Sequence, residues 1–187
     1  MTEDLMGLRV AVLLTDGAEE SEFVKPKEAL EKARAAVTVI SPKGGEIQTF
    51  RHHDKSKKYK ADKSIDEVDP EQFDALLLPG GALNADALRV ESKAQQFART
   101  IDQAARPIAV ICHGPWLLVS AGLVRGRKMT SFHTIQDDLR NAGARWQDSE
   151  VLVDRNWVSS RKPDDIPAFN REMLKLFAQA AQTRKAA

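Results

Sequence analysis

The sequence predicts an α/β fold in which helices cover both faces of a mostly parallel sheet. Apolar runs of strand length alternate with helix-like segments along the chain. Two runs, residues 74–78 and 107–111, are almost continuously apolar, which is typical of strands buried on both faces. The first strand, helix and second strand form a βαβ unit, whose right-handed crossover makes the strands parallel.

The expected elements follow one another without an interdomain linker, so we expect one domain over residues 1–187, with frayed ends at 1–6 and 182–187. Strands are expected at residues 8–14, 37–40, 46–50, 74–78 and 107–111, with a short strand within 125–132 and a hairpin of 151–154 with 157–160. Helices are expected at residues 19–35, 91–105, 117–121 and 134–141, and from 162 to about 181, with a short turn between residues 82 and 91.

Composition excludes several classes of protein. The chain has 187 residues, 42% of them hydrophobic and 29% charged, which is ordinary for a globular protein. A net charge of +1 gives no general attraction to nucleic acid or to an anionic membrane, and we expect neither as a partner. The acidic N-terminus lacks the apolar core of a signal peptide. One cysteine excludes an intrachain disulfide and is compatible with a reducing cytoplasm, where we expect the protein.

That cysteine, Cys112, lies where a buried strand turns sharply into a helix. Such a corner is a nucleophile elbow. Gly114 leaves room for the tight turn, and Gly122 is placed to end the helix. A thiol at a helix N-terminus meets free N–H groups that favour thiolate and stabilise an oxyanion. We therefore expect a lowered pKa for Cys112. The alternative is a buried structural cysteine.

Three segments are expected to meet at the carboxyl edge of the sheet, where ligands bind in such folds. They are residues 16–22 after the first strand, residues 79–81 after the strand at 74–78, and Cys112 with His113. The segments supply carboxylates, glycine N–H groups, and a thiol next to an imidazole. This convergence favours a catalytic Cys112 over a structural one.

Residues 51–60 are polar and strongly basic. The simpler interpretation is a solvated hairpin or loop, and the alternative is a patch for an anionic partner. His52 and His53 would need further ligands to hold a metal, so no metal site is predicted. No organic cofactor is implied either.

The chain resembles the PfpI-type intracellular cysteine peptidases of the ThiJ/PfpI superfamily over nearly its whole length. The resemblance implies a flavodoxin-like three-layer α/β/α sandwich, similar to class I glutamine amidotransferases. Members are linked to peptide hydrolysis, conversion of methylglyoxal, repair of glycated groups, chaperone activity and stress protection. The motifs that carry the resemblance are residues 16–22, 73–81, 111–115, 122–128, 137–144 and 153–161.

The resemblance also implies roles for single residues. Cys112 is the nucleophile, and Glu19 is the acid beside the thiol, although a first-turn helix carboxylate is the alternative for Glu19. His113 handles protons if it can reach the thiol, and is otherwise a surface or interface histidine. Asp86 of a neighbouring subunit orients His113. The N–H groups of Gly81 and His113 form the oxyanion hole. His133 lies on a loop near the site and is given only a minor part.

We therefore expect a cytoplasmic homo-oligomer, at least a dimer, that acts as a stress-response enzyme by thiolate attack on a peptide or a small reactive carbonyl. Two other functions stay open. The protein could be a redox sensor, in which a carboxylate holds an oxidised Cys112. It could also be a holdase chaperone that uses exposed apolar surface.

Overall fold

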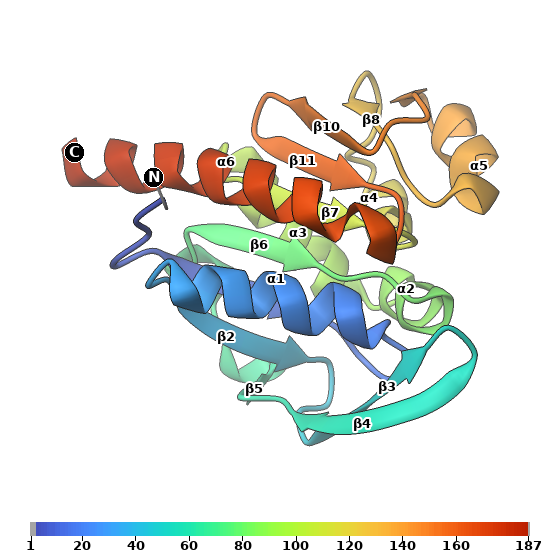
Figure 1. Cartoon of the computed structure of the whole chain (residues 1–187), viewed down its shortest axis with the longest axis horizontal. Coiled ribbons are helices and arrows are strands. Elements are labelled where there is room, and N and C mark those ends of the chain that lie inside the picture. Colours follow the sequence, from blue (N-terminus) through green and yellow to red (C-terminus); the bar gives the residue numbers. More distant parts are fainter. Residues whose placement is uncertain (1–2, 187) are drawn as a thin grey trace.

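The computed structural model describes residues 3–186 and has a seven-stranded sheet at its centre (Figure 1). The strand order is β10-β11-β7-β6-β1-β2-β5, and all neighbours pair in parallel except β10 with β11. The mostly parallel sandwich predicted from the sequence is confirmed. The sheet strands are β1 (Arg9–Leu13), β2 (Ala36–Ser41), β5 (Lys63–Ser64), β6 (Ala75–Leu78), β7 (Ile108–Ile111), β10 (Val151–Asp154) and β11 (Trp157–Ser160).

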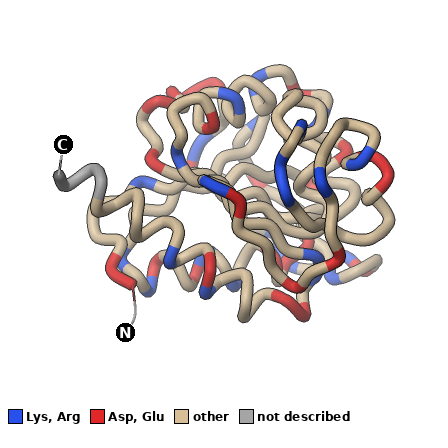
Figure 2. Tube along the Cα trace, turned by 90° about the horizontal axis from the view of Figure 1, so that it is seen from above, with Lys and Arg blue, Asp and Glu red and all other residues tan. Residues whose placement is uncertain are grey.

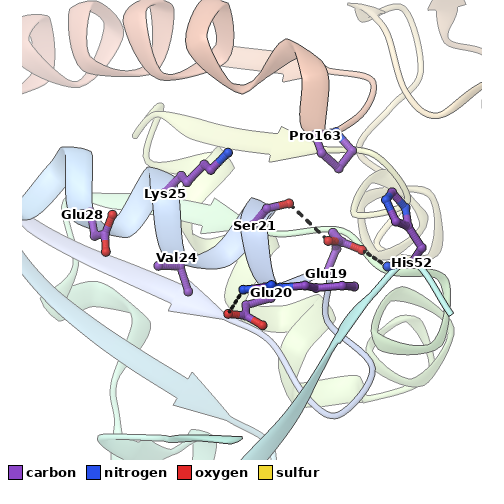
Figure 3. A pocket seen from close by; sticks show the side chains of 9 residues that line it. Glu19, Glu20, Ser21, Val24, Lys25, Glu28, His52 and Pro163 are labelled. Carbon is purple, nitrogen blue, oxygen red and sulfur yellow. Dashed lines mark hydrogen bonds and ion pairs between the residues drawn. The ribbon is translucent and has the colours of Figure 1, made fainter. Parts of the chain in front are cut away.

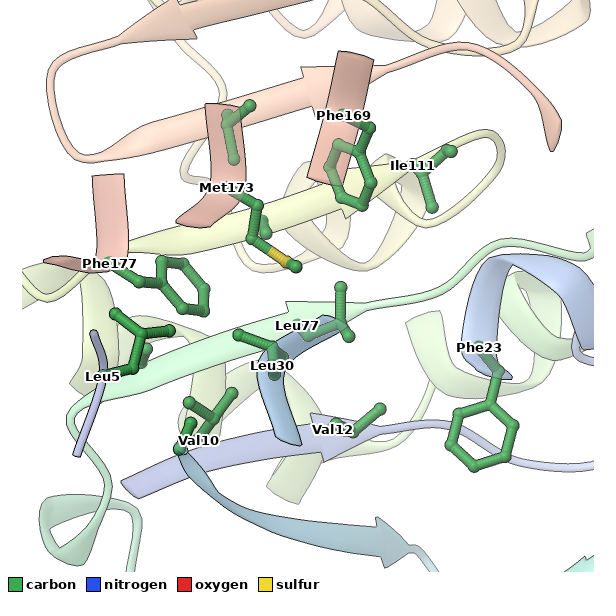
Figure 4. Close-up of a cluster of buried hydrophobic side chains, with 14 of the residues drawn as sticks. Leu5, Val10, Val12, Phe23, Leu30, Leu77, Ile111, Phe169, Met173 and Phe177 are labelled. Carbon is green, nitrogen blue, oxygen red and sulfur yellow. The ribbon is translucent and has the colours of Figure 1, made fainter. Parts of the chain in front are cut away.

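Helices cover both faces of this sheet, and each face has its own apolar core. On one face, Phe23, Leu30 and Met173 pack over Val12 and Leu77 (Figure 4). On the other face, the helices that follow β6 and β7 in the chain cover a second core, which includes Leu76. The helices are α1 (Glu20–Lys32), α2 (Ala82–Arg89), α3 (Ser92–Gln103), α4 (Pro115–Ser120), α5 (Gln136–Asn141) and α6 (Ile166–Ala186).

Two small ribbons lie outside the main sheet. The first, β3 (Glu46–Arg51) with β4 (Asp54–Lys60), is an antiparallel hairpin that includes most of the basic segment. The second pairs β8 (Lys128–Met129) with β9 (Arg145–Trp146). The β3–β4 hairpin projects beyond the end of α1, so its tip lies near the carboxyl edge of the sheet (Figure 1).

The structure corrects two expectations. The turn predicted after residue 81 is the eight-residue helix α2. Leu5 is fully buried and donates its N–H to Ala33 O, so the predicted fraying does not extend to this residue. Helix α6 continues to Ala186, and fraying at this end of the chain stays a prediction. Residues 1, 2 and 187 lie outside the described residues. Among residues 3–186, no helix is both long and apolar enough to cross a lipid bilayer.

Candidate active site

Cys112 occupies the corner between β7 and α4 in a strained backbone conformation. Its φ of 62° lies in the left-handed region that non-glycine residues rarely adopt. Neighbouring backbone holds it there, since Cys112 N–H donates to Ser160 O and Cys112 O accepts from Phe132 N–H. A Cβ at Gly114 would come within 2.9 Å of Leu78 O, so the turn requires glycine. The predicted nucleophile elbow is present.

The thiol borders a cavity of about 440 Å³, called here the Cys112 pocket. Residues from all three predicted segments line it, including Glu19, Gly81 and His113. The tip of the β3–β4 hairpin adds His52 and His53, which sequence reasoning did not place at the site. The full lining is Gly17, Glu19, Glu22, Phe50, His52, His53, Gly81, Ala82, Leu83, Cys112, His113, Phe132 and Pro163.

Two backbone N–H groups point at the nucleophile. Those of Gly81 and His113 hydrogen-bond the Cys112 sulfur and lower the pKa of the thiol. Gly81 has a φ of 90°, which a residue with a Cβ would adopt only with strain. These are the two donors expected for an oxyanion hole, and that role stays a prediction.

The carboxylate next to the thiol is Glu22, and the assignment of Glu19 to that place is corrected. Glu19 caps α1 and faces the hairpin, where its Oε1 accepts from Ser21 Oγ at 3.2 Å and its Oε2 from His52 N–H at 2.9 Å (Figure 3). Glu22 lies about one turn further on and is fully buried. Its Oε2 accepts from Gly80 N–H at 3.0 Å, and its side chain hydrogen-bonds Cys112. The sequence signal that could have identified Glu22 is an acidic residue on the inward face of the helix.

Burial controls the charge of this pair. It raises the pKa of Glu22 to about 8, with a further rise from the charge of Glu19. Burial also raises the pKa of the Cys112 thiol above its usual range, and the charge of Glu22 raises it further. The expected lowering of the Cys112 pKa is therefore wrong. Helix α4 has only six residues, and its N–H groups do not outweigh desolvation.

His113 reaches the thiol, although neighbouring side chains at an elbow can point apart. Its Nδ1 lies 3.2 Å from Cys112 Sγ, and its Nε2 lies 3.3 Å from Thr134 Oγ1. The ring stacks on Phe132 with centroids 4.9 Å apart. Burial, with a contribution from His133, lowers the pKa of His113, so the imidazole is neutral near pH 7. A neutral ring with Nε2–H directed at Thr134 leaves Nδ1 free to accept the thiol proton.

Asp86 does not reach the site within its own chain. It is exposed on α2 and does not line the Cys112 pocket. Within the chain, Thr134 Oγ1 is the partner of His113 Nε2. The expectation that Asp86 of a neighbouring subunit orients His113 stays a prediction. His133 packs against Phe132 with centroids 4.6 Å apart and lies outside the pocket lining. Within residues 3–186, no group of three or more His, Cys, Asp or Glu side chains is suited to hold a metal.

Fold and site together define an α/β-sandwich protein with a cysteine at a strand-to-helix elbow that borders a pocket. Residues 8–176 match the DJ-1/PfpI family, and the chain belongs to that family.

Curated relatives cover the same length. Protein/nucleic acid deglycase 2 of Escherichia coli is 46% identical, over 91% of this chain and 98% of its own. Putative cysteine protease YraA of Bacillus subtilis is 42% identical, over 91% of this chain and 99% of its own. General stress protein 18 of Bacillus subtilis is 42% identical, over 91% and 98%. Among solved structures, Drosophila melanogaster DJ-1beta is 27% identical with a TM-score of 0.85, covering 95% of each chain.

Proposed function

We propose that this chain is a cysteine-dependent hydrolase of the deglycase type, which removes carbonyl adducts from amino groups. The observation that carries the proposal is the contact of Cys112 Sγ with His113 Nδ1 at 3.2 Å, beside two N–H donors in one pocket. Relatives named as a deglycase, a putative cysteine protease and a stress protein support it. All three names are compatible with thiolate attack on a carbonyl carbon.

The proposed reaction begins when the Cys112 thiol gives its proton to His113 Nδ1. The sulfur then bonds to the carbonyl carbon, and the C=O electron pair moves to oxygen, where the N–H groups of Gly81 and His113 hold it. With a peptide bond, the amine leaves with the proton from His113, and water hydrolyses the thioester to acid and free thiol. With a methylglyoxal adduct, the aldehyde-derived carbon already carries a hydroxyl and the amine, so the sulfur replaces the amine at that carbon and the amine leaves with the proton from His113. A C–H proton then moves from that carbon to the neighbouring ketone carbon through an enediol, which leaves a lactoyl thioester that water hydrolyses to lactate and free thiol. Adduct plus one water therefore gives free amine plus lactate without an outside oxidant or reductant.

A second candidate function is redox sensing at the same sulfur. Glu22 Oε1 is buried and has no hydrogen-bond partner in the described part of the chain. With the pKa of Glu22 at about 8, this carboxyl is protonated at neutral pH and able to donate to an oxygen added to Cys112. Sulfenic and sulfinic acids provide such an oxygen.

Assembly and location form part of the proposal. A homo-oligomer, at least a dimer, would cover the exposed side chains of Leu83 on α2 and of Val90 at its C-cap, near Asp86. A cytoplasmic location suits a catalytic thiol that must stay reduced.

One assay series tests both candidate functions. Purified protein and Cys112→Ala are compared on methylglyoxal-modified N-acetyl-lysine, on peptides and with peroxide. We expect amine release by the wild type and a loss on the order of 10³-fold or more in the variant. Equal amine release by both proteins would contradict the hydrolase. If the wild type releases no amine but gains one or two oxygens at Cys112, the redox function is favoured.

A further inference from the structure

Two further cavities lie along helix α1 beside the Cys112 pocket, and neighbouring cavities have lining residues in common. The Cys112 pocket shares Glu19, His52 and Pro163 with an outer cavity of about 500 Å³ (Figure 3). The outer cavity shares Val24 and Glu28 with a third cavity of about 390 Å³, between α1, β2 and β4. We propose that the three cavities form one groove, the α1 groove, that binds an extended polypeptide segment and presents one of its side chains to Cys112. The reaction at Cys112 rests on the proposed function, whereas binding of the segment in the groove does not.

The groove has the length of a short peptide. Its α1 wall runs from Glu19 to Glu31, and both residues line a cavity. Twelve helical residues span about 18 Å at about 1.5 Å per residue. Glu20, Val24 and Glu28 lie on successive turns, so their side chains share one face of the helix. An extended chain advances about 3.3 Å per residue, so roughly five or six residues fill this length.

The lining favours a polypeptide over a polyanion. Val24, Val37 and Tyr59 are half-buried in the lining and give it apolar surface. The charged residues of the lining carry both signs, with Glu28 and Glu31 on α1 among lysines. A phosphate backbone in the groove would meet these carboxylates, whereas mixed charge suits side chains of a peptide. The lysines are Lys25, Lys27 and Lys60.

The two sides of the groove are held together before any ligand binds. Glu20 on α1 accepts from Tyr59 OH at 3.0 Å and from Arg51 at 3.2 Å, and Ser56 Oγ also donates to it. These contacts fix the β3–β4 hairpin against α1. Because the residues of the groove are already ordered, less conformational entropy of the protein is lost when a segment binds.

Binding is tested without catalysis, on Cys112→Ser protein. The probe is an acetylated, amidated, fluorescein-labelled peptide of about nine residues with a central lysine, followed by fluorescence polarisation. Val24→Trp fills the groove and should weaken binding by about fivefold or more. The matched control is Val153→Trp, because Val153 is 47% exposed on β10 and lines none of the three cavities.

Several results would overturn the groove. They are absence of peptide binding, equal weakening in both tryptophan variants, and displacement of the peptide by single-stranded DNA of equal length at equal concentration. Since Val24→Trp can disturb folding, exposed Glu28→Lys is tested beside exposed Glu150→Lys, with a lysine-flanked probe. The groove predicts weaker binding only for Glu28→Lys, and equal affinities for both would count against it.

A kinetic comparison separates the groove from the proposed chemistry. For wild-type protein, kcat/KM on the methylglyoxal-modified peptide should exceed that on modified N-acetyl-lysine by about tenfold, mainly through KM. If neither substrate turns over while the binding result holds, the proposed function fails and the groove stands. If both turn over equally and the peptide does not bind, the groove fails and the function stands.

Discussion

At the residue scale, the candidate site combines a protonated thiol with a neutral imidazole. Burial keeps Glu22 and the Cys112 thiol protonated near neutral pH, and it keeps His113 uncharged. A thiol in this state resists unselective alkylation and oxidation until its proton moves to His113 Nδ1. In the proposed function, the pair Cys112–His113 therefore reacts only with a substrate or an oxidant that enters the pocket.

Removing the charge of Glu22 should make the thiol easier to ionise. Ionised Glu22 raises the pKa of Cys112, so Glu22→Gln lowers it, and the pH midpoint of iodoacetamide labelling moves to lower pH. Mass spectrometry of the labelled protein measures this midpoint. The labelling covers roughly pH 6–11, which spans the pKa values of free and raised thiols. Glu19→Gln is the control, because Glu19 faces the β3–β4 hairpin and its charge acts on Glu22, whereas the charge of Glu22 acts on the thiol directly. An unchanged midpoint in Glu22→Gln, or a larger shift in Glu19→Gln, would contradict this account.

Sequence reasoning found the residues whose place is set by backbone topology. Cys112, His113 and Gly81 follow strands that end at one edge of the sheet, and that convergence is readable from the chain. It chose the wrong carboxylate because Glu19 and Glu22 lie only three residues apart at the start of α1. Only the rotation of the helix about its axis decides which one points inward. The contact with Thr134 could not be foreseen either, because it joins segments about twenty residues apart through an irregular loop.

At the element scale, the β3–β4 hairpin is joined to α1 by several hydrogen bonds to the buried carboxylate of Glu20. Hydrogen bonds from Ser56, Arg51 and Tyr59 lower the pKa of Glu20 to about 2, against a cost of burial. Its ordinary value is about 4.5. Because the folded-state pKa is lower than the unfolded one, the stabilisation is complete above about pH 4.5 and is lost as pH falls toward 2.

Glu20→Gln should therefore destabilise the protein at neutral pH and much less in acid. Arg51 is 67% exposed, so water screens part of the interaction, and we expect a loss of about 1–2 kcal/mol at pH 7. Urea unfolding of wild type and variant at several pH values measures the difference in free energy of unfolding. That difference should shrink between pH 4.5 and 2. A difference independent of pH would mean that the side chain stabilises through shape alone.

The elements that sequence reasoning predicted correctly are those with regular apolar periodicity. The buried strands β6 and β7 and the first crossover are examples. It missed α2, whose formation depends on buried polar contacts. Asn84 is fully buried, accepts from Thr15 N–H at 2.7 Å and donates to Pro79 O and Gly80 O. A polar residue that holds a helix in this way carries no periodic signal.

At the scale of the whole molecule, charge is distributed without a dominant sign, and acidic and basic positions are interspersed along the chain (Figure 2). The face that differs is that of α2. Leu83 and Val90 are 63% and 75% exposed, and Val90 is the C-cap of the helix with a helical backbone conformation. With Asp86 these residues lie at spacings of three, four and seven along the chain. Such spacings place all three side chains on one face. An apolar pair beside an acid, next to the active site, suits contact with another copy of the chain.

The oligomer predicted from the sequence should therefore depend on α2. Sedimentation velocity of wild type at roughly 10 µM should show at least a dimer, and Val90→Glu should shift it toward monomer, since a buried charge is costly. Val153→Glu, at an exposed valine on β10, is the matched control and should keep the oligomer. If Asp86 acts on His113 of a neighbour, Asp86→Asn should lower turnover in a protein that still associates, and should shift its pH profile. Full activity in a strictly monomeric wild type would leave Thr134 as the only described partner of His113 Nε2 and would remove any role for a second subunit at the site.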